Sequence, residues 1–212
     1  MKKYLSKFRD YTNAIINNRN KQLLKNKNFS LISSNCLGGF MLHNLNIRFN
    51  TPTINLFFYA EDYIKFLENL KENLSTDIIE VRDFNLNYPV GKINDEIIIH
   101  FMHYKSFNEA KEKWEERAKR VDFNNLFIIM TDRDGCDEKL IKKFDDLPFE
   151  NKVIFTHKPY PEIKSTFFIK EFIAEESVGH LFHYKQGIQG FFGYKYYDNF
   201  DYVSFFNKGN SN

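Results

Sequence analysis

The sequence has few cysteines and prolines and lacks any long hydrophobic run. Two cysteines in 212 residues, Cys36 and Cys136, cannot form a disulfide framework, which is typical of a protein from a reducing compartment. No apolar segment approaches the roughly 18 residues that a membrane-spanning helix needs. The basic N-terminal segment has no apolar stretch, which argues against a secretory signal. We therefore expect a cytoplasmic protein, with the inner membrane surface as the alternative location.

A strong charge of one sign is also missing. The chain has 30 Lys and Arg against 28 Asp and Glu, a formal net charge of +2. So small a charge argues against a nucleic-acid-binding protein held by phosphate contacts. With 42% hydrophobic and 27% charged residues, the composition is that of a globular protein, and 212 residues suffice for a core without disulfide support.

Short apolar segments alternate with amphipathic ones along the chain. The periodicities predict strands at 29–33, 53–58, 78–81, 96–101, 126–130 and 153–155, and helices at 2–26, 61–74, 106–121 and 138–144. This alternation predicts an α/β fold: a mixed, partly parallel sheet with helices on both faces, in a Rossmann-like three-layer arrangement.

The chain ends differ from this central pattern. Residues 1–28 read as a basic amphipathic helix, residues 29–162 as the α/β core, and residues 163–212 as an aromatic, irregular C-terminal extension packed on the core. In the extension we expect edge strands and a final helix near residues 201–206.

The N-terminal helix carries one apolar stripe among many basic residues. Tyr4, Phe8, Tyr11 and Ile15 recur at helical spacing. The simplest interpretation is that this stripe packs on the core. The alternative is a helix that rests on an anionic membrane surface, as a peripheral membrane contact.

Polar, reactive residues follow four of the predicted strands. Ligands of open α/β sheets bind outside the carboxyl ends of the strands. The four polar segments are residues 33–36, 100–105, 131–134 and 156–158. If the four strands are parallel neighbours, these segments form one site; otherwise they are only the places where polar loops begin.

The first polar segment continues into a glycine-containing turn. Its candidate ligand-binding residues are Ser34, Asn35, Cys36, Gly38 and Gly39. The glycines allow close backbone approach, and a following helix N-terminus can hold a phosphate or carboxylate, although a simple tight turn explains the segment nearly as well. Cys36 is either a nucleophile activated by the helix N-terminus or a small buried side chain.

The segment after residue 130 contains an Asp-x-Asp pattern. Asp132 and Asp134 could share a divalent cation, Mg²⁺ or Mn²⁺, that holds a diphosphate. The alternative is a loop in which Asp134 or Asp137 caps the next helix. Arg133, between the two acids, either neutralises them or binds substrate.

Two histidines are candidates for a general base, namely His103 and His157. Each could equally be a hydrogen-bonded structural residue. Tyr104, Lys105 and Lys158 lie beside them and could bind a substrate phosphate. With no Cys-x-x-Cys or His-Glu-x-x-His pattern, a zinc site has little support.

Five longer segments occur in a fixed order between residues 33 and 161: SSNCLGGFMLHNL, TPTINLFFYAEDYIKFLENL, YPVGK, HFMHYKSFNEAKEKWEERAKR and MTDRDGCDEKLIKKFDDLPFENKVIFTHKPYP. In these segments the chain resembles the bacterial domain-of-unknown-function family 1919, often labelled exopolysaccharide biosynthesis protein. The resemblance covers residues 20–165. It implies a role with sugars or sugar phosphates in cell-surface polysaccharide (capsule) synthesis, and it supplies no reaction.

Residues and resemblance together favour an enzyme, a transferase that acts on an activated sugar or sugar phosphate. The turn at 34–39 would hold a phosphate, the two aspartates a cation or sugar hydroxyls, and one histidine would act as base beside cationic side chains. The alternative is a non-catalytic protein of the same pathway that binds a glycan or a protein partner. A third possibility is a hydrolase with Cys36 as nucleophile.

Overall fold

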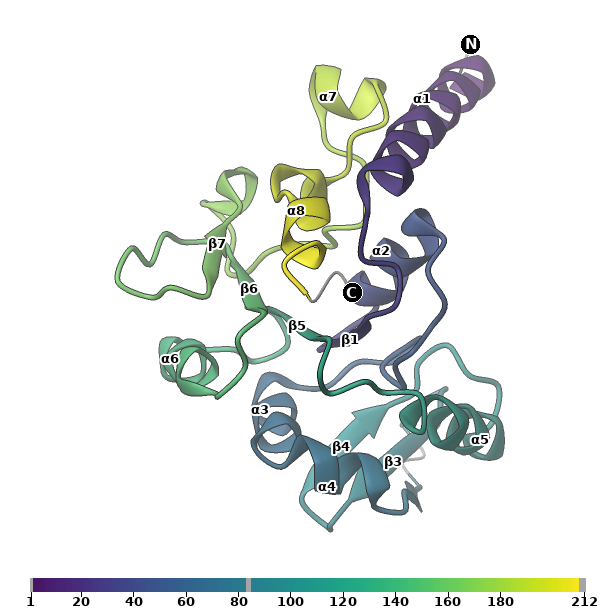
Figure 1. Ribbon diagram of the computed structural model, residues 1–212, viewed down its shortest axis with the longest axis vertical. Coiled ribbons are helices and arrows are strands. Elements are labelled where there is room, and N and C mark those ends of the chain that lie inside the picture. Colours follow the sequence, from purple (N-terminus) through teal and green to yellow (C-terminus); the bar gives the residue numbers. More distant parts are fainter. Residues whose placement is uncertain (1, 83–84, 210–212) are drawn as a thin grey trace.

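The computed structural model describes residues 2–82 and 85–209 and shows an α/β fold with two separate sheets (Figure 1). The larger sheet is parallel, in the order β1 (Ser30–Ser33), β5 (Leu126–Thr131), β6 (Lys152–Thr156) and β7 (Thr166–Phe168). The smaller sheet is antiparallel and contains β2 (Ile79–Val81), β3 (Val90–Ile93) and β4 (Ile97–His100). The predicted α/β class is confirmed, with parallel and antiparallel strands divided between two sheets.

Helices cover both faces of the parallel sheet. Successive strand residues point to opposite faces, and apolar side chains lie on both of them. In β5, Phe127 and Ile129 face a core with α2 (Leu37–Leu45) and α8 (Tyr202–Phe206), whereas Ile128 and Met130 face a second core with α3 (Ala60–Glu68) and α6 (Glu138–Asp146). This is the predicted three-layer arrangement (Figure 1).

The smaller sheet packs with α3, α4 (Leu70–Ser75) and α5 (Phe107–Ala118) around the second core. Trp114 of α5 is buried there, with its ring 5.7 Å from that of Phe66. Ser106 caps α5, at the start of the helix predicted over 106–121, by accepting a hydrogen bond from the Glu109 amide at 3.3 Å. The Glu109 carboxylate accepts from the Lys105 amide, one residue before the cap.

Two element predictions are wrong. Residues 53–58 are not a strand: Phe57 forms only an isolated bridge with His100, because the backbone turns at Asn55, whose φ is +62°. The helix predicted over 61–74 is two helices, since Asn69 leaves the helical region with a φ of −127°. The strand predicted over 96–101 exists as β4, but in the antiparallel sheet.

The C-terminal region contributes to both sheet and core. It contains β7, η1 (Lys170–Phe172), α7 (Gly187–Phe191), η2 (Tyr196–Asn199) and α8. Asp201 caps α8 by accepting from the Ser204 amide at 3.0 Å, so the final helix predicted near 201–206 is confirmed. Met1 and residues 210–212, at the ends of the predicted terminal segments, lie outside the described residues.

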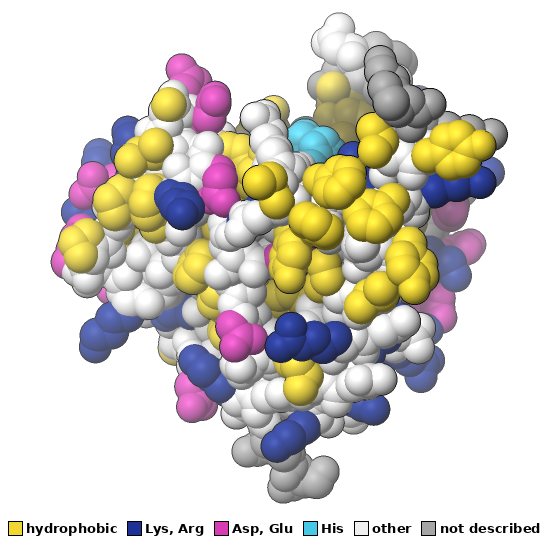
Figure 2. All heavy atoms as spheres, turned by 90° about the horizontal axis from the view of Figure 1, so that it is seen from above, with side chains coloured by type: hydrophobic (Ala, Val, Ile, Leu, Met, Phe, Trp, Pro, Cys, Tyr) yellow, Lys and Arg dark blue, Asp and Glu magenta, His cyan; other side chains and the backbone are white. Residues whose placement is uncertain are grey.

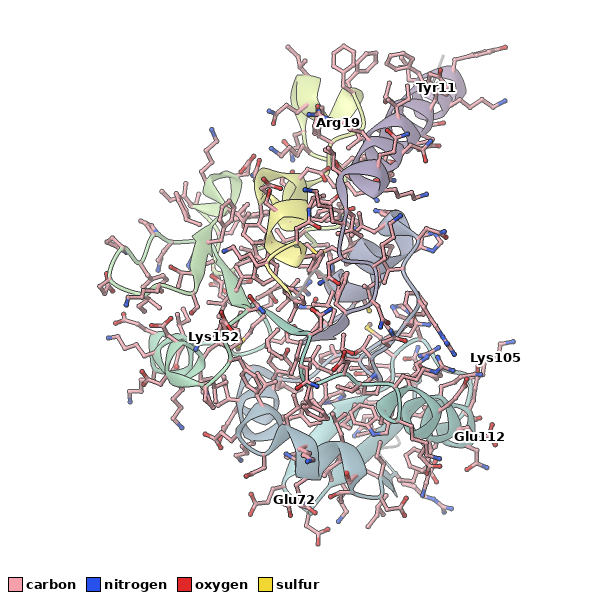
Figure 3. All side chains as sticks on the ribbon, in the orientation of Figure 1. Tyr11, Arg19, Glu72, Lys105, Glu112 and Lys152 are labelled. Carbon is pink, nitrogen blue, oxygen red and sulfur yellow. The ribbon has the colours of Figure 1, made fainter. Side chains whose placement is uncertain are left out.

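The N-terminal helix α1 (Lys2–Leu23) forms as predicted, but its apolar stripe does not pack on the core. Tyr4, Tyr11 and Ile15 are 78%, 66% and 52% exposed. The helix is anchored by its opposite face, where the buried Asn13 side chain donates to the Gly193 carbonyl at 2.7 Å. Figure 3 shows Tyr11 on the part of α1 that extends away from the sheet. Within residues 2–82 and 85–209, no helix has the length and apolar content to cross a bilayer.

Candidate functional site

A cavity of about 400 Å³ opens beyond the carboxyl ends of β1 and β5. We call it the main cavity; its lining residues are Asn35, Cys36, Phe40, Phe57, Met102, His103, Arg133, Asp134, His180 and Phe182. This is the expected ligand position in an open α/β sheet, and the volume suits a small molecule. A groove of about 460 Å³ between α1 and α8 contains none of the strand-end residues.

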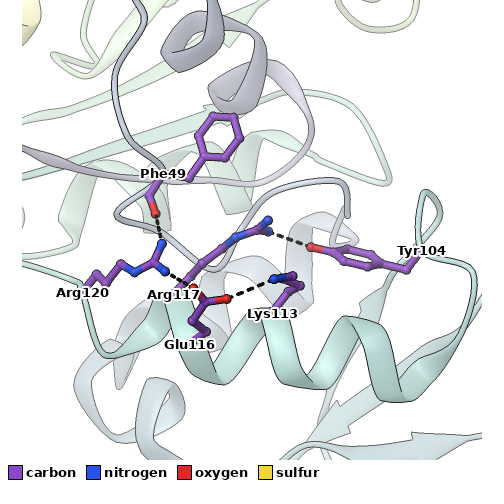
Figure 4. Close-up of polar contacts among 6 residues, drawn as sticks. All are labelled: Phe49, Tyr104, Lys113, Glu116, Arg117 and Arg120. Carbon is purple, nitrogen blue, oxygen red and sulfur yellow. Dashed lines mark hydrogen bonds and ion pairs between the residues drawn. The ribbon is translucent and has the colours of Figure 1, made fainter.

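A side cavity of about 270 Å³ adjoins the main cavity and shares Cys36, Phe40 and His103 with it. Arg117 of α5 lines the side cavity, and its guanidinium donates to the Tyr104 hydroxyl at 2.8 Å (Figure 4). The Tyr104 hydroxyl donates in turn to the Ile54 carbonyl at 3.0 Å. Tyr104, predicted to bind substrate, therefore holds Arg117 in position and lies outside the lining of both cavities.

The turn at 34–39 joins the ends of β1 and β5. The Asn35 amide group donates to Thr131 Oγ1 at 2.8 Å, and its oxygen accepts from the Leu37 backbone amide at 3.1 Å. Ser33 Oγ accepts from the Gly38 amide at 3.2 Å. Two amide groups at the start of α2 thus donate to side chains of the chain itself, and the geometry gives a phosphate cradle at this turn little support.

The two glycines of this turn serve packing. A Cβ atom at Gly38 would lie 2.7 Å from the Cβ of Ser33, so only glycine lets α2 approach β1 this closely. Gly39 lines the side cavity, where a Cβ would meet Ile54 at an ordinary 3.5 Å. Ser34 is buried and lies outside the cavity lining. Of this turn, Asn35 and Cys36 are the residues that reach the main cavity.

Cys36 lies at the wall shared by the two cavities, with its Sγ 3.7 Å from the Leu56 carbonyl oxygen. Burial raises the pKa of the Cys36 thiol, and the nearby Arg133 charge only partly opposes this effect. A raised pKa does not favour a thiolate at neutral pH, so the structure gives the hydrolase hypothesis no support from an activated Cys36.

The Asp-x-Asp pattern divides into a structural half and a cavity half. Asp132 is buried, and its Oδ2 accepts from both the backbone amide, at 2.7 Å, and the Nδ1 of His157. Its Oδ1 accepts from the Val178 amide at 2.8 Å. Asp132 and His157 thus tie β5, β6 and the C-terminal region together, outside the cavity lining.

A metal shared by the two aspartates has no geometric support. Both carboxylate oxygens of Asp132 are engaged by N–H donors of the protein. Within the described ranges, no cluster of three or more His, Cys, Asp and Glu side chains is arranged to hold a metal ion. The sequence pattern gave no means of telling which direction each carboxylate faces.

Asp134 is the cavity half of the pattern. Its φ is +57° and that of Gly135 is +81°, so the chain turns sharply, and the Asp134 carbonyl accepts from the Ala60 amide at 2.9 Å. Burial raises the pKa of the Asp134 carboxyl, with a partly opposing effect of Arg133. The cap of α6 is Asp137, which accepts from the Leu140 amide at 2.9 Å.

Arg133 carries the main positive charge of the cavity. One Nη donates to His180 Nδ1 at 2.8 Å, so that nitrogen is an acceptor and the imidazole is neutral, with its proton on Nε2. Burial, together with the Arg133 charge, lowers the pKa of His180, in keeping with this neutral form. The other Nη lies 3.9 Å from the Asp134 carboxylate, beyond hydrogen-bond distance. The guanidinium charge is therefore only partly compensated.

The walls of the main cavity are largely aromatic. The rings of Phe40 and Phe182 stack with centroids 4.1 Å apart, and Phe57 stacks on His100 at 4.5 Å. Sequence reasoning missed Phe40, Phe57, Phe182 and His180. The only signal for two of them is the cluster HLFHY at 180–184 in the aromatic C-terminal region, where no predicted strand end placed it near the site.

Of the remaining predicted residues, His103 lines the cavities, whereas Lys105 and Lys158 do not. His103 reaches both cavities because the Phe57–His100 bridge draws the end of β4 to the site, although β4 belongs to the other sheet. The His103 backbone amide donates to the Asn55 carbonyl at 3.3 Å. Lys105 and Lys158 are exposed and lie outside both linings; Figure 3 shows Lys105 at the periphery, beyond α5.

Comparison with known proteins identifies similarity over most of the chain. A family model described as a domain of unknown function (DUF1919) matches residues 7–207. A protein of Haemophilus influenzae (strain ATCC 51907 / DSM 11121 / KW20 / Rd), described as an uncharacterized protein, is 48% identical over 192 residues, which is 91% of this chain and 90% of the relative. The match includes the C-terminal region that supplies His180 and Phe182 to the cavity. The chain belongs to the DUF1919 family.

Proposed function

We propose that the chain is a transferase of cell-surface polysaccharide synthesis that binds an activated sugar or sugar phosphate in the main cavity. The observation that carries the proposal is Arg133, a partly compensated cation in a largely aromatic cavity. A guanidinium pairs readily with a phosphate through two parallel hydrogen bonds. The pathway rests on the label that the family often carries, and the ligand class on the cavity.

The cavity offers separate surfaces to the two parts of such a ligand. The phosphate would lie against Arg133, with Arg117 available across the side cavity for a second phosphate. The sugar ring, or a nucleobase, would pack against Phe57 or the stacked pair of Phe40 and Phe182. The volume of about 400 Å³ is sufficient for a sugar phosphate.

The reaction we propose is transfer of the sugar to an acceptor hydroxyl. His103 accepts the hydroxyl proton, the acceptor oxygen bonds to the sugar carbon, and the bond from that carbon to the phosphate oxygen breaks. The leaving phosphate takes the electron pair, and Arg133 stabilises its charge. Asp134 orients sugar hydroxyls from the same wall of the cavity.

A thermal-shift panel of nucleoside-diphosphate sugars and sugar 1-phosphates, with and without Mg²⁺ or Mn²⁺, tests the binding step. A ligand at about 100 times its Kd stabilises the fold by roughly 2.7 kcal/mol, which raises the midpoint by about 5–10 °C. We expect Arg133→Gln to abolish the shift and Arg120→Gln to retain it, because Arg120, just after the end of α5, pairs with Glu116 outside the main cavity (Figure 4). A panel without any shift would contradict the proposal.

A second variant separates catalysis from simple binding. His103→Asn removes the proposed base and leaves Arg133 and the aromatic walls intact. If the chain is a transferase, the variant keeps the ligand-induced shift but loses release of phosphate or nucleotide in the presence of acceptor. If wild type and variant bind equally and neither releases product with any acceptor, the chain is a binding protein of the same pathway.

A further inference from the structure

The outer face of α1 and the segment around α7 form one exposed apolar surface. Figure 2 shows hydrophobic side chains gathered over this end of the molecule, with Lys and Arg at the margin. Ile188 on α7 and Tyr4 on α1 are each 78% exposed. We call this surface the α1–α7 patch; its members are Tyr4, Leu5, Phe8, Tyr11, Ile15, Ile188, Phe191, Phe192 and Tyr194.

The patch is a built surface, although its two halves are far apart in the sequence. The Phe8 ring lies 5.1 Å from that of Phe191 and 6.1 Å from that of Phe192. Behind the rings, the Asn13 side chain donates to the Gly193 carbonyl at 2.7 Å. With a φ of +82° and a hypothetical Cβ only 2.6 Å from the Asn13 nitrogen, Gly193 permits this close contact where other residues do not.

A second set of contacts fixes the same junction. The Arg9 guanidinium lies over the Tyr184 ring, 4.1 Å from its centroid, and the Tyr184 hydroxyl donates to Asp10 at 3.1 Å. The exposed rings are therefore held in one orientation by the buried Asn13–Gly193 hydrogen bond and by the Arg9–Tyr184–Asp10 contacts. Large apolar side chains kept exposed in this way mark an interaction surface.

The charge around the patch selects the partner. The sequence of α1 contains six basic residues, Lys2, Lys3, Lys7, Arg9, Arg19 and Lys21, against one acid, Asp10. At helical spacing, Lys7 and Arg19 flank the stripe formed by Tyr4, Phe8, Tyr11 and Ile15. A second copy of the chain would bring two such basic helices together, which their mutual repulsion disfavours.

We propose that the α1–α7 patch docks the protein on an anionic phospholipid bilayer. Ile188 and the aromatic rings enter the interface between headgroups and acyl chains, where aromatic residues are favoured, and Lys7 and Arg19 of α1 lie against the anionic headgroups. This proposal concerns a surface outside the main cavity and does not depend on the proposed transferase activity.

Sedimentation with lipid vesicles tests the proposal on the full chain. The probes are vesicles of phosphatidylcholine alone and of phosphatidylcholine with phosphatidylglycerol. We expect binding to the anionic vesicles that weakens as salt is added, and little binding to the neutral ones. Absence of binding to anionic vesicles, or equal binding to both kinds, would overturn the proposal.

Exposed positions allow variants that keep the fold. Ile188→Ser should weaken vesicle binding about tenfold or more, because the variant lacks the apolar side chain whose transfer from water into the bilayer interface favours binding. Lys7→Glu should weaken it roughly fivefold or more, since each basic residue near an anionic surface contributes about 1 kcal/mol. The matched controls are Ile173→Ser and Lys139→Glu, exposed residues outside the patch, which should bind as wild type does.

Two results would assign the patch differently. If Ile188→Ser and Lys7→Glu bind vesicles as tightly as the controls, lipid contact occurs elsewhere and the proposal fails. If the wild type does not bind vesicles but forms a dimer that Ile188→Ser dissociates, as measured by light scattering, the patch is an interface between two copies of the chain.

Discussion

Asp132→Asn and Asp134→Asn form a matched pair that tests whether the Asp-x-Asp pattern is divided as the structure indicates. Both substitutions keep the side-chain volume and remove one charge. The Asp132 carboxylate accepts hydrogen bonds from two backbone amides, those of His157 and Val178, and from the His157 ring. An asparagine at 132 must turn its NH₂ group toward one of these donors.

The expected cost at Asp132 follows from its burial and its contacts. The carboxylate is 1% exposed, and hydrogen bonds to a charged group contribute about 1.5–3 kcal/mol each. Since removing one partner of a buried pair costs about 3–5 kcal/mol, we expect Asp132→Asn to lower the free energy of unfolding by that amount. At Asp134 the nearest cation is 3.9 Å away and the positive φ also suits asparagine, so the loss should stay within about 1 kcal/mol.

Urea unfolding followed by fluorescence measures both values. Trp114 is the single tryptophan and is buried in the core, so its emission reports global unfolding. Asp134→Asn should lose transferase activity at nearly wild-type stability, whereas Asp132→Asn should be strongly destabilised. Equal free energies of unfolding for the two variants would refute the division of the pattern.

Three further predictions concern single groups. Cys36 should react with iodoacetamide near neutral pH more slowly than a free thiol, because burial raises its pKa; selective fast labelling would restore the nucleophile hypothesis. Burial raises the pKa of Asp198 from 3.8 to about 6, so the folded state keeps this proton to a higher pH than the unfolded state does. As the pH rises from 4 to 6, the free energy of unfolding should therefore fall by up to roughly 3 kcal/mol, and Asp198→Asn should remove that fall. Gly38→Ala should lower the midpoint of thermal unfolding, since overpacking costs about 1–3 kcal/mol, whereas Gly39→Ala should leave it nearly unchanged; the same effect at both positions would contradict the packing argument.

The parallel part of the fold was predictable because its residues follow local rules. Continuous apolar strands such as residues 126–130 are decided within a few residues. The two-sheet division was not, because β3 and β4 form a local hairpin, and whether that hairpin joins the larger sheet depends on contacts across the chain. At Gly91 in β3, a Cβ would lie 2.6 Å from the Ile78 side chain, a constraint visible only in three dimensions.

The candidate site was partly predictable for a similar reason. Asn35, Cys36, Arg133 and Asp134 reach the cavity because they follow strands of one parallel sheet, as the strand-end rule requires. That rule also selected Asp132 and His157, whose side chains turn toward each other and away from the cavity.

The part of the site that could not be predicted comes from outside the strand ends. His180 and Phe182 enter the cavity from the irregular C-terminal region, and Arg117 enters from a helix. No local pattern indicates where such segments lie, because their position depends on contacts with distant elements, such as the Arg133–His180 hydrogen bond at 2.8 Å.

A crystal structure of the chain with the panel ligand that gives the largest thermal shift tests the central claim most directly. We expect electron density for the ligand in the main cavity, with a phosphate oxygen within hydrogen-bond distance of the Arg133 guanidinium and a ring against Phe57 or the Phe40–Phe182 pair. Density in the groove between α1 and α8, or a phosphate bound away from Arg133, would contradict the assignment of the main cavity as the functional site.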